Sequence, residues 1–263
     1  MGSRQFTSQL ILLSLGFWLI VGCEERIVYI PSGGDVTPPK DSVQNRALEF
    51  LGTNGFVDIT SSSLLRPGTF TVEIYVKFDT LHNGMIPLLS ATGINQWNTA
   101  DGFNLKYEAM KFYLTFATSS NNGTVVSKDT VAPLKKWIHF AATYDKTQMK
   151  LYLDGNLVAL APQIATVYYG GRGLTIGSAF HSSFGGWNYF CGQIDELRIW
   201  SDARTQSQIQ GSMKKKLNGD ESGLVGYWSF DQSPLDNYAL DQSVWNNHGL
   251  MFGDVRFVAS DVF

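Results

Sequence analysis

A strict alternation of apolar and polar side chains over residues 69–78 constrains the fold of this chain more than any other feature of its sequence. Apolar side chains recur at every second position: Phe70, Val72, Ile74, Val76 and Phe78. The positions between them carry Thr71, Glu73, Tyr75 and Lys77. A period of two places each set on its own face of an extended chain, as in a β-strand with one buried face. We therefore predict a long strand here, with the apolar set in the core.

The same alternation continues in shorter runs along most of the chain. It predicts further strands over residues 111–116, 137–144, 149–153, 157–161, 224–230 and 250–252. Asp154-Gly155-Asn156 separates two of these runs, and an Asp-Gly pair accepts the positive φ angles that a tight hairpin turn requires. We expect a β-hairpin at this point.

One stretch in the C-terminal third, residues 203–216, departs from this pattern. Thr205 and Gln208 have the spacing of a capping box, and three lysines at 214–216 lie where the dipole of a helix favours cations. These features predict one short helix. Many short strands with a single helix indicate an all-β fold, a two-sheet antiparallel jelly-roll sandwich.

The N-terminus has the features of an export signal. Residues 10–21 are apolar, Arg4 is the only charged residue before them, and the run is shorter than the roughly 20 residues that span a bilayer. The sequence Ile20-Val21-Gly22-Cys23 resembles the bacterial lipobox, in which the cysteine is diacylated and becomes the new N-terminus. We predict a lipoprotein signal peptide over residues 1–22; an ordinary secretory peptide with a chance cysteine is the alternative.

A lipidated Cys23 fixes the compartment of the mature chain. It predicts attachment to a membrane of the bacterial cell envelope, the outer membrane, with exposure at the cell surface left open. Residues 23–43 combine charges, glycine and proline without a period, so we expect a flexible tether there and a folded domain over residues 44–263. Cys191 then has no partner and is predicted to be a buried, inert thiol, with a Cys23–Cys191 disulfide as the alternative.

The charge of the chain excludes two classes of partner. Its formal net charge is −3 at pH 7. Nucleic-acid binding requires a basic face, and electrostatic docking on anionic lipid requires a basic patch. We expect no nucleic-acid partner, and membrane contact through the lipid alone.

Four segments, in their order and spacing, resemble the laminin G-like and pentraxin-like branch of the concanavalin A-like lectin/glucanase superfamily. They are 47–59, 137–145, 151–155 and 192–200. Segments 223–231 and 241–249 are typical of the bacterial members. The resemblance implies a jelly roll whose loops form a rim, in a non-catalytic, lectin-like protein.

Residues 192–200 also predict a local irregularity. Ile194, Leu197 and Ile199 cannot all share one face of a regular strand, so we expect a β-bulge near Asp195-Glu196. Arg198 is expected to pair with Glu196 at the surface, where such a pair contributes under about 1 kcal/mol.

The superfamily includes glucan hydrolases, so catalysis has to be weighed. Glycoside hydrolysis needs two carboxyl groups about 5–10 Å apart. Asp195 and Glu196 are adjacent, Glu73 lies on an otherwise neutral face, and the Glu-x-Asp-x-x-Glu strand of the glucanases is absent. His139, within a strand, is expected to be structural with a satisfied hydrogen bond. We predict that the protein is not an enzyme; a degenerate glycoside hydrolase is the less favoured alternative.

Pentraxin relatives bind calcium through acidic and amide residues in a loop that corresponds to residues 178–183. That loop contains no carboxylate here, and calcium requires six to eight oxygen ligands. The resemblance therefore implies that this calcium site is lost. A structural calcium elsewhere stays open, with Asp58 and Asp195 as candidate ligands, and no other cofactor is expected.

Carbohydrate binding by a β-sandwich needs exposed aromatic rings beside amides or carboxylates. Three turn-rich segments supply such residues: Trp97 and Asn98; Tyr168 and Tyr169; and Trp187, Asn188 and Tyr189. These are the predicted ligand-binding residues, the alternative being that their rings pack beneath the loops. We predict binding of a glycan or of an envelope or extracellular protein through these rim loops. A structural or adhesive module of an envelope assembly is the other hypothesis.

Overall fold

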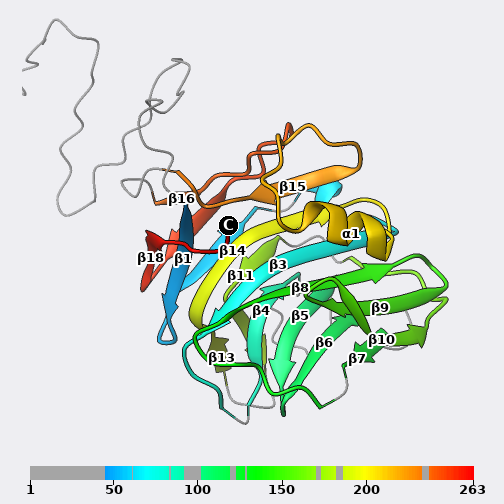
Figure 1. Cartoon of the computed structure of the whole chain (residues 1–263), viewed down its shortest axis with the longest axis horizontal. Coiled ribbons are helices and arrows are strands. Elements are labelled where there is room, and N and C mark those ends of the chain that lie inside the picture. The colour runs from blue at the N-terminus through cyan, green and yellow to red at the C-terminus, as the bar shows by residue number, and fades with distance from the viewer. Residues whose placement is uncertain are drawn as a thin grey trace, which may run out of the picture. The chain divides into compact units, whose positions relative to one another are not determined.

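The computed structural model describes most of the chain beyond residue 44 and shows two facing antiparallel sheets (Figure 1). The described residues are 45–60, 62–82, 84–91, 102–118, 123–127, 129–169, 173–181, 186–232 and 237–263. The predicted all-β sandwich with one short helix is confirmed. The signal peptide, Cys23 and the tether lie outside the described residues.

Sheet A follows the order β10-β9-β8-β3-β14-β1-β18, with β15 also paired to β14. Its strands are β1 (Arg46–Leu51), β3 (Phe70–Phe78), β8 (Trp137–Tyr144), β9 (Gln148–Leu153), β10 (Asn156–Pro162), β14 (Cys191–Trp200), β15 (Leu224–Trp228) and β18 (Val255–Ala259). The strands predicted over residues 69–78 and 137–144 are its centre.

Sheet B follows the order β16-β17-β2-β11-β4-β5-β6-β7. Its strands are β2 (Phe56–Ile59), β4 (Ile86–Ser90), β5 (Phe103–Glu108), β6 (Lys111–Phe116), β7 (Gly123–Val126), β11 (Leu174–Ile176), β16 (Tyr238–Ala239) and β17 (Gly249–Phe252). A separate hairpin pairs β12 (Ser178–His181) with β13 (Gly186–Tyr189), and a short 3-10 helix, η1, covers Ser63–Leu65.

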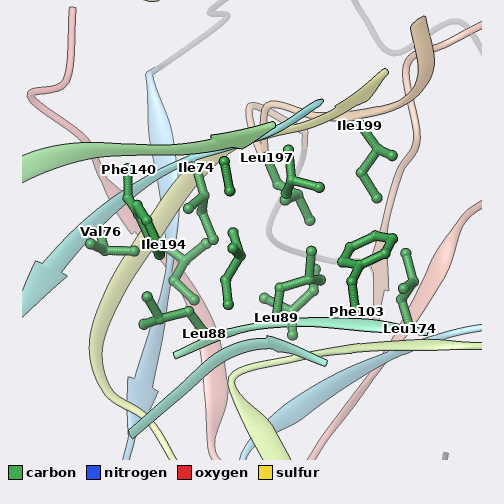
Figure 2. Close-up of a cluster of buried hydrophobic side chains, with 14 of the residues drawn as sticks. Ile74, Val76, Leu88, Leu89, Phe103, Phe140, Leu174, Ile194, Leu197 and Ile199 are labelled. Atoms are coloured by element: carbon green, nitrogen blue, oxygen red, sulfur yellow. The ribbon is translucent and has the colours of Figure 1, made fainter. Parts of the chain in front are cut away.

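The core fills the space between the two sheets. Every apolar member of the β3 alternation is fully buried, as predicted. Figure 2 shows Ile74, Val76 and Phe140 of sheet A facing Leu88, Leu89 and Phe103 of sheet B. Because side chains alternate along each strand, the residues between these core positions point away from the core, onto the outer faces of the sheets.

Two local predictions about strands are confirmed. Asp154 and Gly155 both have positive φ, 48° and 72°, and join β9 to β10 in a two-residue turn. The pairing of β14 with β3 shifts register between Asp195 and Arg198, and Glu196 has φ 49°, which is the expected bulge. The bulge allows Ile194, Leu197 and Ile199 all to reach the core.

The predicted helix is present but shorter than expected. α1 spans Gln206–Ser212, and Thr205 is its N-cap in a complete capping box with Gln208. The expected role of the three lysines is wrong, because the helix ends before them and its last turn contains no basic residue. Lys216 instead pairs with Asp231 across 2.7 Å.

α1 packs on the outer face of sheet A. Its buried Ile209 contacts Ala141 and Tyr152 of the sheet. Gln210 Nε2 donates to the carbonyl of Gly155 at 2.9 Å, and a Cβ at Gly155 would lie only 2.8 Å from the Gln210 side chain. The β9–β10 turn therefore forms part of the seat of the helix, and glycine is required there by both φ and space.

Segment 241–249 folds around one buried carboxylate. Asp241 accepts hydrogen bonds from the backbone N–H groups of Tyr227, Ser243 and Asn247 at 2.7–2.8 Å, and from the Ser243 hydroxyl at 2.9 Å. Its hydrogen-bonding capacity is used within the fold, so this segment is structural.

The Cys191 thiol and the length of the helices bear on two further expectations from the sequence. Cys191 is a free thiol but is half-buried rather than buried. Among the described residues, no helix has the length and apolar character needed to cross a membrane.

Candidate functional site

A single row of side chains crosses the outer face of sheet B. Pairing in register joins one residue from each of seven neighbouring strands, β16 to β6: Tyr238, Leu250, Asp58, Thr175, Ser90, Asn104 and Thr115. Their sequence neighbours Val57, Ile176, Leu105 and Leu114 are buried in the core. The row therefore belongs to the opposite face, and we call it the cross-sheet row.

The middle of the cross-sheet row consists of hydroxyl and amide groups. The Ser90 hydroxyl donates to Asn104 Oδ1 at 2.7 Å, and Asn104 Nδ2 donates to Thr115 Oγ1 at 3.4 Å. Ser90 is buried, whereas Thr175, Asn104 and Thr115 are half-buried. These hydrogen bonds fix the side chains on a rigid sheet, which is the preorganisation that a polar ligand needs.

Asp58 contributes the only charge within the row. It is exposed, and no described side chain forms a hydrogen bond or an ion pair with it. Partial burial raises the pKa of its carboxyl group. A carboxylate that accepts no bond within the protein keeps its oxygens available for the donors of a ligand.

An apolar group forms the β16–β17 end of this face. Tyr238 is 45% exposed, Leu250 36% and Phe252 40%. Phe252 stacks on Phe56 of β2, with ring centroids 5.0 Å apart and ring planes 17° apart. We call Tyr238, Leu250, Phe252 and Phe56 the apolar end.

The lysines of this face are neutralised by neighbours. Lys106 Nζ lies 2.6 Å from Glu108 Oε2 and 5.1 Å from the centre of the Tyr113 ring. Lys111 Nζ lies 3.1 Å from Asp129 Oδ1. On the described strands of sheet B, the unpaired charge is thus the negative one of Asp58.

The structure describes the three predicted ligand loops to different extents. Trp97 and Asn98 fall outside the described residues, but the segment that contains them leaves β4 after Ala91 and reaches β5 at Gly102, beside Ser90 and Asn104 of the row. Gly102 N–H donates to the carbonyl of Tyr168, so the second loop lies beside the start of β5.

The two tyrosines of the second loop have different environments. The ring of Tyr168 is 54% exposed and available to a ligand. The ring of Tyr169 packs on the core, edge-on to Phe103 at 6.5 Å, and its hydroxyl donates to the carbonyl of Pro67 at 3.0 Å. Tyr169 therefore supports the loop from beneath.

The third predicted loop is the β12–β13 hairpin, which packs against β4. The backbone of Trp187 lies in β13, while its side chain is outside the described residues. Asn188 and Tyr189 are half-buried, and Asn188 Nδ2 is a buried donor without an acceptor. Gly177 N–H bonds the carbonyl of Leu88, so this hairpin leaves β11 at the opposite end of β4 from the first two loops.

The two candidate calcium ligands lie in unlike places. Asp58 is on sheet B, whereas Asp195 lies in the bulge of sheet A, buried, with Oδ2 2.5 Å from Ser260 Oγ. Burial raises the pKa of Asp195 to about 8. Within the described ranges, no three His, Cys, Asp or Glu side chains gather as a metal site would require.

The outer face of sheet A carries most of the buried charge of the domain. Glu73 accepts a hydrogen bond from Trp200 Nε1 at 2.8 Å, and its Oε2 lies 3.3 Å from Nε2 of His139. Burial alone would raise the pKa of Glu73, but His139 and the charges of Arg198 and Arg204 outweigh it and hold that pKa below its ordinary value. The expectation that Glu73 lies on a neutral face is therefore wrong.

Arg198 completes this cluster and differs from its prediction. It pairs with Glu196 at 2.6 Å, but both side chains are buried, not at the surface. Arg198 also donates to the carbonyls of Ser212, the last residue of α1, and of Lys215, beyond the helix. The hydroxyl of Tyr227 donates to Glu196 at 3.0 Å. We call Glu73, His139, Arg198 and Glu196 the buried charge cluster; closed off beneath the segment after α1, it holds the fold together.

Comparison with known proteins agrees with this architecture. Residues 51–210 match the family model described as the concanavalin A-like lectin/glucanases superfamily. The chain belongs to this superfamily. The predicted membership is thus confirmed.

Solved structures share the fold of this superfamily member at low sequence identity. A candidate carbohydrate-binding protein from Bacteroides ovatus is 19% identical with a TM-score of 0.64, over 83% of this chain and 60% of that one. A SAP-like pentraxin from Limulus polyphemus is 16% identical with a TM-score of 0.56, over 84% and 98%. The CBM40 domain of the Ruminococcus gnavus IT-sialidase, solved with α2,3-sialyllactose, is 18% identical with a TM-score of 0.51, over 62% and 95%.

A curated relative matches a smaller part of the chain. Pappalysin-1 of Mus musculus is 34% identical over 90 residues, which are 31% of this chain and 5% of that protein. The superfamily member described here therefore spans a small part of that relative and less than two thirds of the Bacteroides ovatus protein.

The cross-sheet row is the feature that the sequence prediction missed. Its seven members come from seven separate strands, and only the strand order and register of sheet B bring them together. Asp58 was named, but as a metal ligand. The available signal was the alternation within residues 103–116, which places Asn104 and Thr115 opposite the core positions.

Proposed function

We propose that the protein is a non-catalytic glycan-binding protein of the bacterial cell envelope, held to the membrane by a lipid on Cys23. The observation that carries the binding is the unpaired carboxylate of Asp58 within a preorganised row of hydroxyl and amide groups. Carbohydrate-binding neighbours of the same fold support this choice of ligand class.

The groups of the cross-sheet row suit the hydroxyl groups of a sugar. Asp58 accepts two hydroxyl protons, and a bond to a charged acceptor is roughly twice as strong as a neutral one. Asn104 and Thr115 offer both donors and acceptors, whereas the Thr175 hydroxyl donates to the carbonyl of Ser178 at 3.0 Å and offers an acceptor only. The apolar end flanks the row with exposed side chains on which sugar rings stack, and Tyr168 is exposed in the loop that meets β5 at Gly102.

The placement of the acids argues against hydrolysis. The described strands of this face carry two carboxylates, Asp58 on β2 and Glu108 on β5, and Glu108 is already paired with Lys106. Two strands lie between β2 and β5, so at about 4.8 Å per strand step the two acids are at least about 14 Å apart. Glycosidases hold theirs at about 5–10 Å.

A glycan array with the mature chain tests this function. We expect binding to a subset of glycans in the wild type, and its loss by tenfold or more in Asp58→Ala and in Asn104→Ala. Asp220→Ala, which removes an exposed carboxylate elsewhere, is the matched control and should bind as the wild type does. Absence of binding to any glycan, or equal binding by all four proteins, would reject the proposal.

The lipid anchor has its own test. Mass spectrometry of the mature N-terminus should find a diacylated Cys23, and Cys23→Ser should move the protein from the membrane fraction to the soluble fraction. An unmodified Cys23 in membrane-bound protein would contradict the anchor without touching the glycan site.

A further inference from the structure

The segment that follows β18 lies on the outer face of sheet A. β18 ends at Ala259, and residues 260–263 belong to no strand or helix. The backbone N–H of Ser260 donates to the carbonyl of Asn45 at 2.9 Å, and Asn45 Nδ2 donates to the carbonyl of Phe263 at 3.2 Å. Both bonds hold the segment beside the start of β1. We call residues 260–263 the strap.

Polar side chains of three neighbouring strands receive the strap. The hydroxyl of Ser260 donates to Oδ2 of Asp195, on β14, at 2.5 Å. Asp261 Oδ1 accepts a hydrogen bond from Trp137 Nε1, on β8, at 2.6 Å, and lies 3.3 Å from Nζ of Lys77, on β3. A hydroxyl and a carboxylate at successive positions of the strap therefore each have their own partner on the sheet.

An aromatic contact completes the set. The ring of Phe263 lies edge-on to that of Tyr75, with ring centroids 5.8 Å apart and ring planes at 86°. Tyr75 is buried, and its hydroxyl donates to the carbonyl of Met213, after α1, at 3.0 Å. The ring that receives Phe263 is therefore held in place by the sheet and by the segment after the helix.

The receiving groups are rigid, whereas the strap is loosely held. Lys77 Nζ lies 4.6 Å from the centre of the Trp137 ring, so these two side chains position each other on paired strands. By contrast, no residue of the strap is buried: the Asp261 side chain is 81% exposed and Phe263 is 43% exposed. A segment with so little buried surface opens at a low free-energy cost while the rest of the fold stays closed.

This combination resembles a peptide bound to a preformed surface. Peptide-recognition surfaces hold an extended segment through separate partners for individual side chains, as the sheet does here for a hydroxyl, a carboxylate and an aromatic ring. Covalent attachment gives the strap an effective concentration of about 1 mM or more, so it occupies the surface even if each contact is weak. A second peptide reaches the surface only by displacing it.

We propose that the outer face of sheet A is a peptide-binding surface that the strap occupies in cis. A partner protein would displace the strap with an extended segment that carries a hydroxyl, a carboxylate and an aromatic ring in the same order. Asp195, Lys77, Trp137 and Tyr75 are the groups that would receive it. This surface is on the other sheet from the cross-sheet row, so the inference does not depend on glycan binding.

The first experiment releases the strap in the mature chain. In the double variant Asp261→Ala/Phe263→Ala, the NMR signal of the Trp137 indole N–H should shift, because its acceptor is removed. Trp137→Phe assigns that signal. Both substituted side chains are exposed, so the amide signals of Ile74 and Phe140 in the core should stay in place, as should all signals in the control Asp220→Ala. Movement of the core signals, or a variant that does not fold, would make the strap part of the sandwich and overturn the proposal.

The second experiment supplies the strap in trans. The probe is a synthetic peptide with the sequence of residues 258–263, amidated and carrying 4-fluorophenylalanine in place of Phe263, and its binding is followed by fluorine NMR. We expect the double variant to bind the peptide at least about tenfold more tightly than the wild type, whose own strap competes. The peptide should also return the Trp137 indole signal of the variant to its wild-type position.

A second peptide, with alanine at the positions of Asp261 and Phe263, is the matched control and should not bind. Three outcomes would overturn the proposal: no binding of the first peptide to the double variant, equal binding to the variant and the wild type, or binding without recovery of the Trp137 signal. Each would mean that the contacts of the strap are structural and are not a surface for a partner.

Discussion

The outer faces of the two sheets differ in the accessibility of their polar groups. On sheet A, Glu73, Glu196 and Arg198 are each at most 2% exposed, and each has a partner in the fold. Sheet B carries fewer charges, but Asp58 is exposed and has no partner among the described residues. The number of charges on a face therefore differs from its free hydrogen-bonding capacity, and it is the latter on which the proposed site on sheet B depends.

The physical reason lies in the cost of dehydration. A charge taken out of water is tolerated only with a close partner and further hydrogen bonds. Removing one partner leaves the other buried with its dehydration penalty uncompensated. The buried charge cluster meets this condition in part, through Trp200, the Glu196–Arg198 pair and the carbonyls of Ser212 and Lys215. Glu73 Oε2, both ring nitrogens of His139 and Arg198 Nε make no hydrogen bond, but the cluster is buried and therefore closed to a ligand.

The largest expected effect follows from breaking the buried charge cluster. Glu73→Ala removes the acceptor of Trp200 and the partner charge of His139 and of the nearby arginines. We expect the free energy of unfolding to fall by about 3–5 kcal/mol, as for other buried ion pairs that lose one member. Guanidinium denaturation measures this loss.

Glu73→Gln sharpens the same experiment. Glutamine keeps an oxygen for Trp200 Nε1 and removes only the charge, so its loss should be smaller than that of alanine. A loss below about 1 kcal/mol in the alanine variant would mean that the cluster contributes little to the free energy of unfolding. The two outer faces would then not differ in their importance for stability.

The buried carboxyl group of Asp195, in sheet A, should make the free energy of unfolding depend on pH. Its pKa rises from 3.8 to about 8 on folding because it is buried. The folded state therefore holds a proton that the unfolded state loses above pH 4, and stability falls as pH rises between these values. Between pH 5.5 and 7.5 one such group lowers the free energy of unfolding by about 2–3 kcal/mol.

Asp195→Asn tests this dependence. The variant should be less sensitive to pH over this window, so its stability relative to the wild type should increase from pH 5.5 to pH 7.5. Chemical denaturation at the two pH values gives the difference, and Asp58→Asn, on the exposed face, is the control. If the free energy of unfolding changed equally with pH in the wild type and in Asp195→Asn, Asp195 would be ionised at both pH values.

A smaller effect is expected at the N-cap of α1. Thr205 accepts a hydrogen bond from the backbone N–H of Gln208 at 3.3 Å, and Thr205→Ala should cost about 1 kcal/mol. Thermal unfolding followed by circular dichroism measures it. Lys214→Ala, beyond the helix end, should cost less than about 0.5 kcal/mol, and a larger loss there would restore the helix-dipole role.

The smallest effect on stability is expected on sheet B. Asp58→Ala removes an exposed side chain without partners and should change the free energy of unfolding by less than about 0.5 kcal/mol. The same variant should lose glycan binding. A destabilisation above about 1 kcal/mol would show that Asp58 is structural, and the difference between the two faces would disappear.

Local patterns in the sequence predicted most of the fold. The period of two over residues 69–78, the Asp-Gly turn and the capping box each depend on residues close together in the chain, and each is confirmed. The bulge was predictable as well, because three apolar residues with unequal spacing all had to reach the core.

The candidate site was less predictable for a physical reason. The cross-sheet row depends on which strands are neighbours and on their register, and no local period encodes either. The rim loops were chosen for their aromatic residues, yet aromatic residues also serve the core, as Tyr169 does beside Phe103. The burial of Arg198 depends in the same way on α1 and the segment after it, which fold over sheet A from a distant part of the chain.

The seat of α1 also sets an order of events during synthesis. The helix rests on the turn at Gly155, more than fifty residues earlier in the chain, and the carbonyls that bind Arg198 belong to the end of the helix and to the segment after it. Until residue 215 has been synthesised, Arg198 therefore lacks two of its carbonyl acceptors. A nascent chain halted between β14 and α1 leaves this guanidinium without its full set of partners.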